Sequence, residues 1–338
     1  MKYCIDENTM TSIADAIRRK NPNYQTMLPA TMVTAIDEIE TGGGGGGELD
    51  WSKIAAGLLP EAGADISLSM VGEEFDGCST IRPYLFATSD IRSLTTDDSI
   101  ETVGIAVCDS CTSLEAVHLP WVTSLDERAF SACYNLTTVD IPNLESVGYN
   151  CLQGVPFNGE VVFDSLKYTS IYDQGAFSLG AGTLDNMTSF RGGSMPAVGQ
   201  QFFQGRARLQ TVDLPECTQV GDNAFDGCSS LQGFDFSKIA WLGDGAFQNC
   251  GSLPSELHFP ALTHIGGFVF YGCSQIQSLY FQQRWEETPW TDPFSEMEGL
   301  TDIYVPWSEG ELDGAPWGAE NATIHYDTQY DDDGNVIS

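Results

Sequence analysis

The stretch LDERAFSACYNLTTVDIP, residues 125–142, decides the fold of this 338-residue chain, because variants of it recur along most of the sequence. Each variant begins with an aliphatic residue that glycine commonly follows. Successive starts are separated by 22, 22, 24, 27, 22, 22 and 23 residues. The starts are Val103, Leu125, Val147, Ile171, Val198, Val220, Leu242 and Ile265. A period of this length predicts a stack of short units instead of two or three independent globular domains.

Two columns of residues follow each start and indicate an interior. An apolar residue, often aromatic, stands five positions after the start, and a cysteine stands three positions later. We expect both columns to face inward and the thiols to form a buried, reduced ladder, because their spacing is unlike the paired spacing of disulfide or metal sites. The columns are Cys108, Phe130, Leu152, Phe203, Phe225, Phe247 and Phe270, with Phe177 one residue out of register, and then Cys111, Cys133, Cys228, Cys250 and Cys273.

A short strand closes each repeat. Apolar residues alternate at period two after the cysteine column, as at Val139 and Ile141, and proline often ends the strand, as at Pro142. We therefore predict a solenoid, mainly β, over residues 49–326, with one short parallel strand and one short helical or 3₁₀ segment in each of about ten repeats. A last strand near residues 322–326 would close the exposed edge.

The ends of the chain differ from the repeats. Residues 1–41 predict a small helical module, with a first amphipathic helix over residues 9–20 and a second after Pro29. Two such helices are too small for a stable core, so we expect docking on a partner or self-association into a homo-oligomer. The glycine run predicts a flexible hinge over residues 42–48. The acidic residues at the C-terminal end predict a loose tail over residues 327–338.

The charge balance limits the partners. The chain has 48 acidic and 14 basic side chains, a formal charge of −34. Such a surface repels phosphate backbones and anionic lipids, so we expect no nucleic-acid partner and no membrane insertion. The first residues also lack the apolar run of a secretory signal, and no apolar stretch is long enough to span a bilayer.

The sequence contains few motifs that are typical of catalytic or metal-binding sites. Cys108 and Cys111 form a C-x-x-C pair, but no second pair would complete a zinc site. The segment 331–335 is similar to the start of a calcium loop and lacks the glutamate that should follow. The four histidines are not part of an HExxH motif, and no serine in a Gly-x-Ser-x-Gly motif is present to act as a nucleophile with a histidine base. We expect no catalytic residues, no metal and no cofactor.

The outward position of each strand is the best candidate for ligand binding. On a solenoid these positions line one continuous surface. Aromatic rings among carboxylates suit a polar, ring-bearing ligand such as a sugar, although each residue alone could be an ordinary exposed strand residue. The candidates are His118, Trp121, Asp140, Asp213, Asp235, His258, Tyr280 and Tyr304, and Val162 shares the column.

The repeat at residues 125–142 closely resembles the BspA-like leucine-rich repeat family, and the resemblance extends over residues 66–306. It implies a leucine-rich repeat solenoid that binds proteins or host surfaces, as adhesins do, without catalysis by the repeats. The family leaves the ligand open.

The N-terminus, residues 2–18 and 28–32, resembles the leader of tail proteins from phages of Gram-positive gut bacteria, as does the segment 303–319. This resemblance implies that residues 1–41 attach to a phage tail or baseplate protein. The solenoid would then recognise a host cell-surface glycan or protein, and the chain would be part of the virion tail.

Three alternatives remain open at this stage. A bacterial surface adhesin of the same repeat type is one, and an intracellular scaffold is another. A tail enzyme that degrades polysaccharide is the third, and it would need two carboxylates about 5 to 9.5 Å apart. Asp213 and Asp235, on neighbouring strands, are the pair that could meet that distance.

Overall fold

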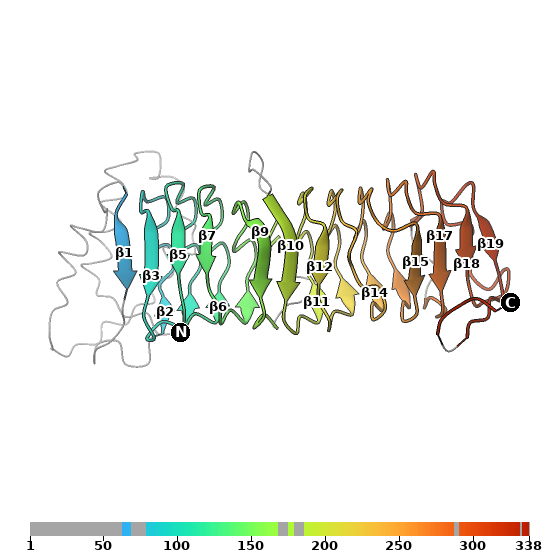
Figure 1. Ribbon diagram of the computed structural model, residues 1–338, viewed down its shortest axis with the longest axis horizontal. Helices are drawn as coiled ribbons and strands as arrows, with labels where there is room; N and C mark the ends of the chain where they lie inside the picture. The colour runs from blue at the N-terminus through green and yellow to red at the C-terminus, as the bar shows by residue number, and fades with distance from the viewer. Residues whose placement is uncertain are drawn as a thin grey trace, which may run out of the picture.

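The computed structural model describes residues 63–68, 79–167, 175–178, 186–286, 291–331 and 333–337. These residues form an elongated solenoid whose turns follow one another in chain order along the long axis (Figure 1). The solenoid has about ten turns, as predicted. The predicted helical module over residues 1–41 and the hinge over 42–48 lie outside the described residues.

One row of parallel strands runs along the length of the molecule and is called here the long-strand face (Figure 1). Inward and outward residues alternate along each strand, so that Leu94 and Val117 are buried and face each other across β3 and β5. The strands are β1 (Asp65–Leu68), β3 (Ser93–Thr96), β5 (Ala116–His118), β7 (Thr138–Asp140), β9 (Asn158–Phe163), β10 (Asn186–Gly192), β12 (Thr211–Asp213), β15 (Glu256–Phe259), β17 (Ser278–Phe281), β18 (Asp302–Tyr304) and β19 (Thr323–His325).

A second row of two-residue strands forms another side of the solenoid, so the prediction of one strand per repeat is wrong. These strands contain the repeat starts, and their pairing is also parallel, as between Leu125 and Val147. A two-residue strand is too short to show the alternation of apolar and polar residues by which a strand is recognised in a sequence. They are β2 (Thr80–Ile81), β4 (Thr102–Val103), β6 (Ser124–Leu125), β8 (Ser146–Val147), β11 (Ala197–Val198), β13 (Gln219–Val220), β14 (Trp241–Leu242) and β16 (His264–Ile265).

The segment that follows each repeat start is a turn and not a helix. The described residues contain no helix, so the predicted helical or 3₁₀ segment is wrong. The reason is a pair of left-handed residues, three and seven positions after the start, which interrupt the negative φ that a helix requires. These residues are Ala106 and Ser110, Arg128 and Ala132, Asn150 and Gly154, Gln201 and Gly205, Asn223 and Gly227, Gly245 and Asn249, and Phe268 and Gly272.

These turn segments form a third ladder between repeats. The Phe130 N–H donates to the Cys151 carbonyl of the next repeat at 2.8 Å, and Phe225 donates to Ala246 at 2.9 Å. The backbone N–H groups two residues before and two residues after Phe130 and Phe225 also donate to carbonyls of the next repeat. Where both rows of strands are continuous, each repeat is thus joined to its neighbours by backbone hydrogen bonds on three sides.

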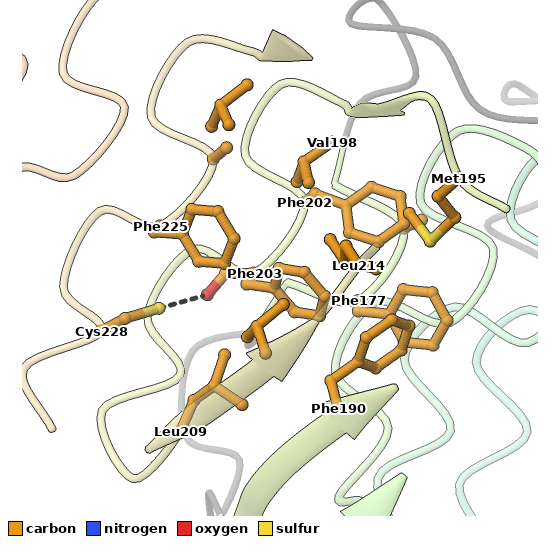
Figure 2. Close-up of a cluster of buried hydrophobic side chains, with 14 of the residues drawn as sticks. Phe177, Phe190, Met195, Val198, Phe202, Phe203, Leu209, Leu214, Phe225 and Cys228 are labelled. Carbon is orange, nitrogen blue, oxygen red and sulfur yellow. Dashed lines mark hydrogen bonds between the residues drawn. The ribbon is translucent and has the colours of Figure 1, made fainter. Parts of the chain in front are cut away.

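The aromatic column stacks through the interior, as predicted. The rings of Phe203, Phe225 and Phe247 lie nearly parallel, with centroids 5.2 and 4.9 Å apart. Figure 2 shows part of this core, where the Phe190 ring meets both Phe203 and Phe177 edge-on and the Phe177 ring stacks on Phe203. All five rings are buried.

The cysteine column is also buried, and each thiol has a backbone partner. The Cys228 Sγ donates to the Phe203 carbonyl at 3.3 Å (Figure 2), and Cys250 donates to Phe225 at 3.1 Å. The described cysteines are free of disulfides. Burial raises the pKa of the Cys273 thiol to about 12 and that of Cys250 well above its ordinary value. The expected ladder of reduced thiols is therefore what the interior contains.

Arg206 replaces cysteine in one repeat. Its side chain is fully buried. The Nε donates to the Phe177 carbonyl at 2.8 Å, and an Nη donates to the Val155 carbonyl at 3.0 Å. The longer side chain thus reaches two earlier repeats, where a thiol reaches one. It lies at the repeat junction where the sequence period lengthens to 27 residues.

Replacing Arg206 by methionine should lower the free energy of unfolding by about 2 to 3 kcal/mol, because two buried carbonyls lose a charged donor. Urea unfolding would measure the change. Arg208→Met is the matched control, since this exposed arginine donates to Asn186 Oδ1 at 3.0 Å and should cost within about 0.5 kcal/mol. Equal costs for the two variants would contradict the role given to Arg206.

The buried thiols predict a loss of stability in alkali. Because their pKa is raised in the folded state, unfolded thiols ionise from about pH 9 while Cys273 stays protonated until about pH 12. The stabilisation is complete below pH 9 and falls as the pH rises, by up to about 1.4 kcal/mol per pH unit for each thiol. Urea unfolding at stepped pH should show a shallower fall for the variant Cys250→Ala/Cys273→Ala. A fall as steep as that of the wild type would contradict the assignment.

Candidate functional site

The outward side chains of the long-strand face form one line, called here the face column. Strand pairing places equivalent residues side by side, as for His118 and Asp140, or Tyr280 and Tyr304. Asp235 follows by two residues the bridge between Thr211 and Gly233. The face column contains Thr95, His118, Asp140, Val162, Arg191, Asp213, Asp235, His258, Tyr280, Tyr304 and His325.

The structure therefore brings seven of the eight predicted site residues into one line. Trp121 is the exception: it is 55% exposed, but it lies in the turn after β5, beyond Pro120 and outside the column. Whether any of these residues binds a ligand stays a prediction.

The N-terminal part of the face column is polar and open. The His118 Nδ1 lies 3.4 Å from an Asp140 carboxylate oxygen, and both side chains are about half exposed. Arg191 turns to a neighbouring loop, where its Nε donates to Asp164 Oδ1 at 2.7 Å. Ion pairs this exposed contribute little to stability, so these side chains can change partners at small cost.

The C-terminal part is a stack of four rings, called here the aromatic ladder: His258, Tyr280, Tyr304 and His325. Successive centroids are 4.3, 4.5 and 4.2 Å apart, and the ring planes differ by 5°, 6° and 8°. The strand spacing of about 4.8 Å sets this contact, because it is close to the stacking distance of aromatic rings.

Stacking changes what the rings can offer a ligand. A sugar was expected to lie on exposed ring faces, but both faces of Tyr280 and Tyr304 are covered by their neighbours. These two rings present only edges and hydroxyl groups. The open faces are those at the two ends of the ladder, on His258 and His325.

His325, like Thr95 and Arg191, is a face-column residue that the sequence did not single out. It lies on β19, the predicted closing strand, directly beside Tyr304. Its Nε2 lies 2.7 Å from Asp302 Oδ1, and hydrogen bonding to His325 lowers the pKa of the Asp302 carboxyl. The sequence spacing could have revealed this position, because His325 follows Tyr304 by 21 residues, which is close to the length of one repeat.

The C-terminal segment lies against the solenoid, which differs from the expected loose tail. The Tyr330 hydroxyl donates to the Tyr304 carbonyl at 3.3 Å, and Tyr330 forms an antiparallel bridge with Val336. The Asp331 carboxylate closes this turn by accepting from the backbone N–H of Asp333 and of Asn335 at 3.0 and 2.8 Å. The loop that is similar to a calcium site thus uses Asp331 for its own backbone.

Other chemistry finds little support among the described residues. In the ranges given above, no group of three or more His, Cys, Asp or Glu side chains is placed to hold a metal ion. The Cys108 thiol donates to Cys111 and lowers the pKa of that thiol, while burial raises the pKa of Cys108. The described part of the chain contains no helix that could cross a membrane.

Comparison with protein families agrees with the repeat geometry. The model of the BspA type leucine rich repeat region matches residues 77–189 and 194–312 in six copies. The chain belongs to this family.

The solved structures that match this chain include several bacterial proteins. A leucine-rich repeat protein from Bacteroides ovatus is 17% identical, with 73% of this chain and 87% of that chain covered and a TM-score of 0.34. A leucine rich cell surface protein from Faecalibacterium prausnitzii is 17% identical, with 79% and 89% covered and a TM-score of 0.34. The pneumococcal vaccine antigen PcpA is 11% identical, with 78% and 84% covered and a TM-score of 0.37. A comparison with curated proteins gave no match.

The aromatic ladder lies on the long-strand face of this BspA type repeat solenoid. Replacing Tyr280 by alanine removes two stacking contacts and should lower the free energy of unfolding by about 1 to 2 kcal/mol. Tyr134→Ala is the control, because Tyr134 is 45% exposed and lies in a turn. Urea unfolding of both variants gives the comparison, and an equal loss would show that the ladder does not stabilise the fold.

Proposed function

We propose that this protein is a non-catalytic binding protein that recognises a host cell-surface glycan or protein through its long-strand face. The observation that carries the proposal is the face column, which lines up histidines, tyrosines and aspartates over the length of the solenoid. A continuous surface of this kind suits an extended ligand.

The rigidity of the aromatic ladder favours binding. Side chains that are already stacked lose little conformational freedom when a ligand arrives, which lowers the entropic cost of association. The aromatic ladder holds four rings in this way. The formal charge of −34 makes polyanions unfavourable ligands.

We further propose a place on a phage tail. The support is the resemblance of residues 2–18 and 28–32 to phage tail leaders, with residues 1–41 attaching to a tail or baseplate protein. The chain would then be a virion component made in the host cytoplasm. The BspA type repeat equally favours the alternative, a bacterial surface adhesin. Antibody against the solenoid would label the tails of purified particles in the first case and the cell wall in the second.

A polysaccharide-degrading tail enzyme is the alternative from a different class. Asp213 and Asp235 lie in neighbouring turns on the same face, as a pair of catalytic carboxylates would. Asp235 Oδ1, however, accepts the Ser237 N–H at 2.8 Å in its own turn, so one of its two carboxylate oxygens is already engaged by the backbone.

The test is to incubate the full chain with cells and wall fractions of candidate Gram-positive gut bacteria and to measure bound protein and released sugar together. We expect saturable binding without sugar release. The variant Asp140→Lys/Asp213→Lys should weaken binding at least about tenfold, because it alters the face column. Glu127→Lys/Glu320→Lys makes the same change of charge at exposed positions off the strands and should bind normally.

Each part of the proposal has its own contrary result. Released oligosaccharide would overturn the non-catalytic assignment. Equal loss in the two charge variants would mean that overall charge, and not the long-strand face, governs binding. Absence of binding to every cell type tested would favour a scaffold role.

A further inference from the structure

The row of long strands is divided into three sheets, with one break between β7 and β9 and another between β12 and β15. The single bridge from Thr211 to Gly233 continues the sheet by one residue, and the next strand that belongs to a sheet is β15. A cavity of about 520 Å³ opens there on the long-strand face. Its lining includes Asp235, Glu256, His258, Gln282, Asp333 and Asn335.

The open end of the aromatic ladder borders this cavity. One face of the His258 ring stacks on Tyr280 at 4.3 Å. The cavity is lined by His258 and by Asp235, which belongs to the preceding repeat, and does not extend to Tyr280. The free face of the His258 ring is therefore on the cavity side, and the three rings behind it hold it in place.

The C-terminal segment forms one wall. Gly334 has a φ of +83°, and a side chain there would come within 2.8 Å of Gln282 Nε2. The Asp331 turn holds this segment closed through Asn335, whose amide donates to Asp331 Oδ2 at 2.9 Å. The cavity is thus bounded by three successive repeats and by a C-terminal segment that is distant from the first of them in sequence.

The polar groups of the cavity are mostly acceptors. Asp235, Glu256 and Asp333 supply carboxylates, Gln282 and Asn335 supply amides, and no lysine or arginine is among the residues that line it. Sugar hydroxyls donate well to carboxylates, and the C–H face of a sugar ring packs on a flat aromatic ring. An anionic sugar would meet three like charges.

We propose that this cavity binds one uncharged sugar residue, with the sugar ring on the free face of His258 and its hydroxyls donating to Asp235 and Glu256. This rests on the proposed function, since it names the ligand class for one end of the same face. Tyr280 and Tyr304 support His258 from behind and do not touch the ligand.

The test uses the full chain and titration followed by NMR or calorimetry. The probes are three uncharged trisaccharides, maltotriose, cellotriose and triacetylchitotriose, with trigalacturonate as the anionic comparison. At least one uncharged probe should bind, and trigalacturonate should not. His258→Ala should weaken binding about tenfold, and His258→Phe, which keeps a flat ring, should restore most of it.

His325→Ala is the matched control. It removes the same side chain from the other end of the ladder, where the ring stacks on Tyr304 at 4.2 Å, and it should leave sugar affinity unchanged. The double variant Asp235→Asn/Glu256→Gln should reduce affinity while keeping the shape of the cavity. Its folding would be checked by the unfolding midpoint.

Three results would overturn the sugar site. These are an absence of binding by all three uncharged probes, equal binding of trigalacturonate, or equal loss in His258→Ala and His325→Ala. If cells are still bound when the uncharged probes fail, the sugar site is wrong while the proposed surface-binding function stands. If the chain binds an uncharged probe but no cells, the sugar site stands and the proposed surface-binding function is wrong.

Discussion

The structure depends on hydrogen bonds that each repeat can complete only with its neighbours. The long strands, the two-residue strands and the turn segments each donate across repeats, as at Val117, Leu125 and Phe130. Buried backbone groups without partners are costly, so a repeat must keep the same shape as the repeats on either side. This constraint brings equivalent residues into line, inside and outside.

The interior and the face are two results of that alignment. Inside, it produces the phenylalanine stack and the thiol ladder; where the repeat lengthens, Arg206 donates to the carbonyls of two earlier repeats. Outside, it places His258, Tyr280, Tyr304 and His325 at stacking distance. Because the strand spacing stacks the rings, the inner rings expose only their edges. The free ring faces are on His258 and His325, at the two ends of the ladder.

Much of this could be predicted from the sequence, because strict columns at one period reveal which residues share an environment. The core columns, the long strands and the face column, with Asp140 and Tyr304, follow in this way. The turn ladder does not, because its left-handed positions hold residues such as Arg128 that ordinarily avoid this conformation. The cavity beside His258 was also beyond the sequence, since it needs the fold of residues 333–335 against a distant repeat.

Native-state hydrogen exchange, read by mass spectrometry across residues 93–281, tests most directly whether neighbours hold each repeat on all three sides. The account predicts that the amides of the turn segments, such as Phe130 and Phe225, are protected as strongly as the strand amides of the same repeat, because the three ladders open together. Turn amides that exchange orders of magnitude faster than the strands would contradict it. The repeats would then be held by the two rows of strands alone.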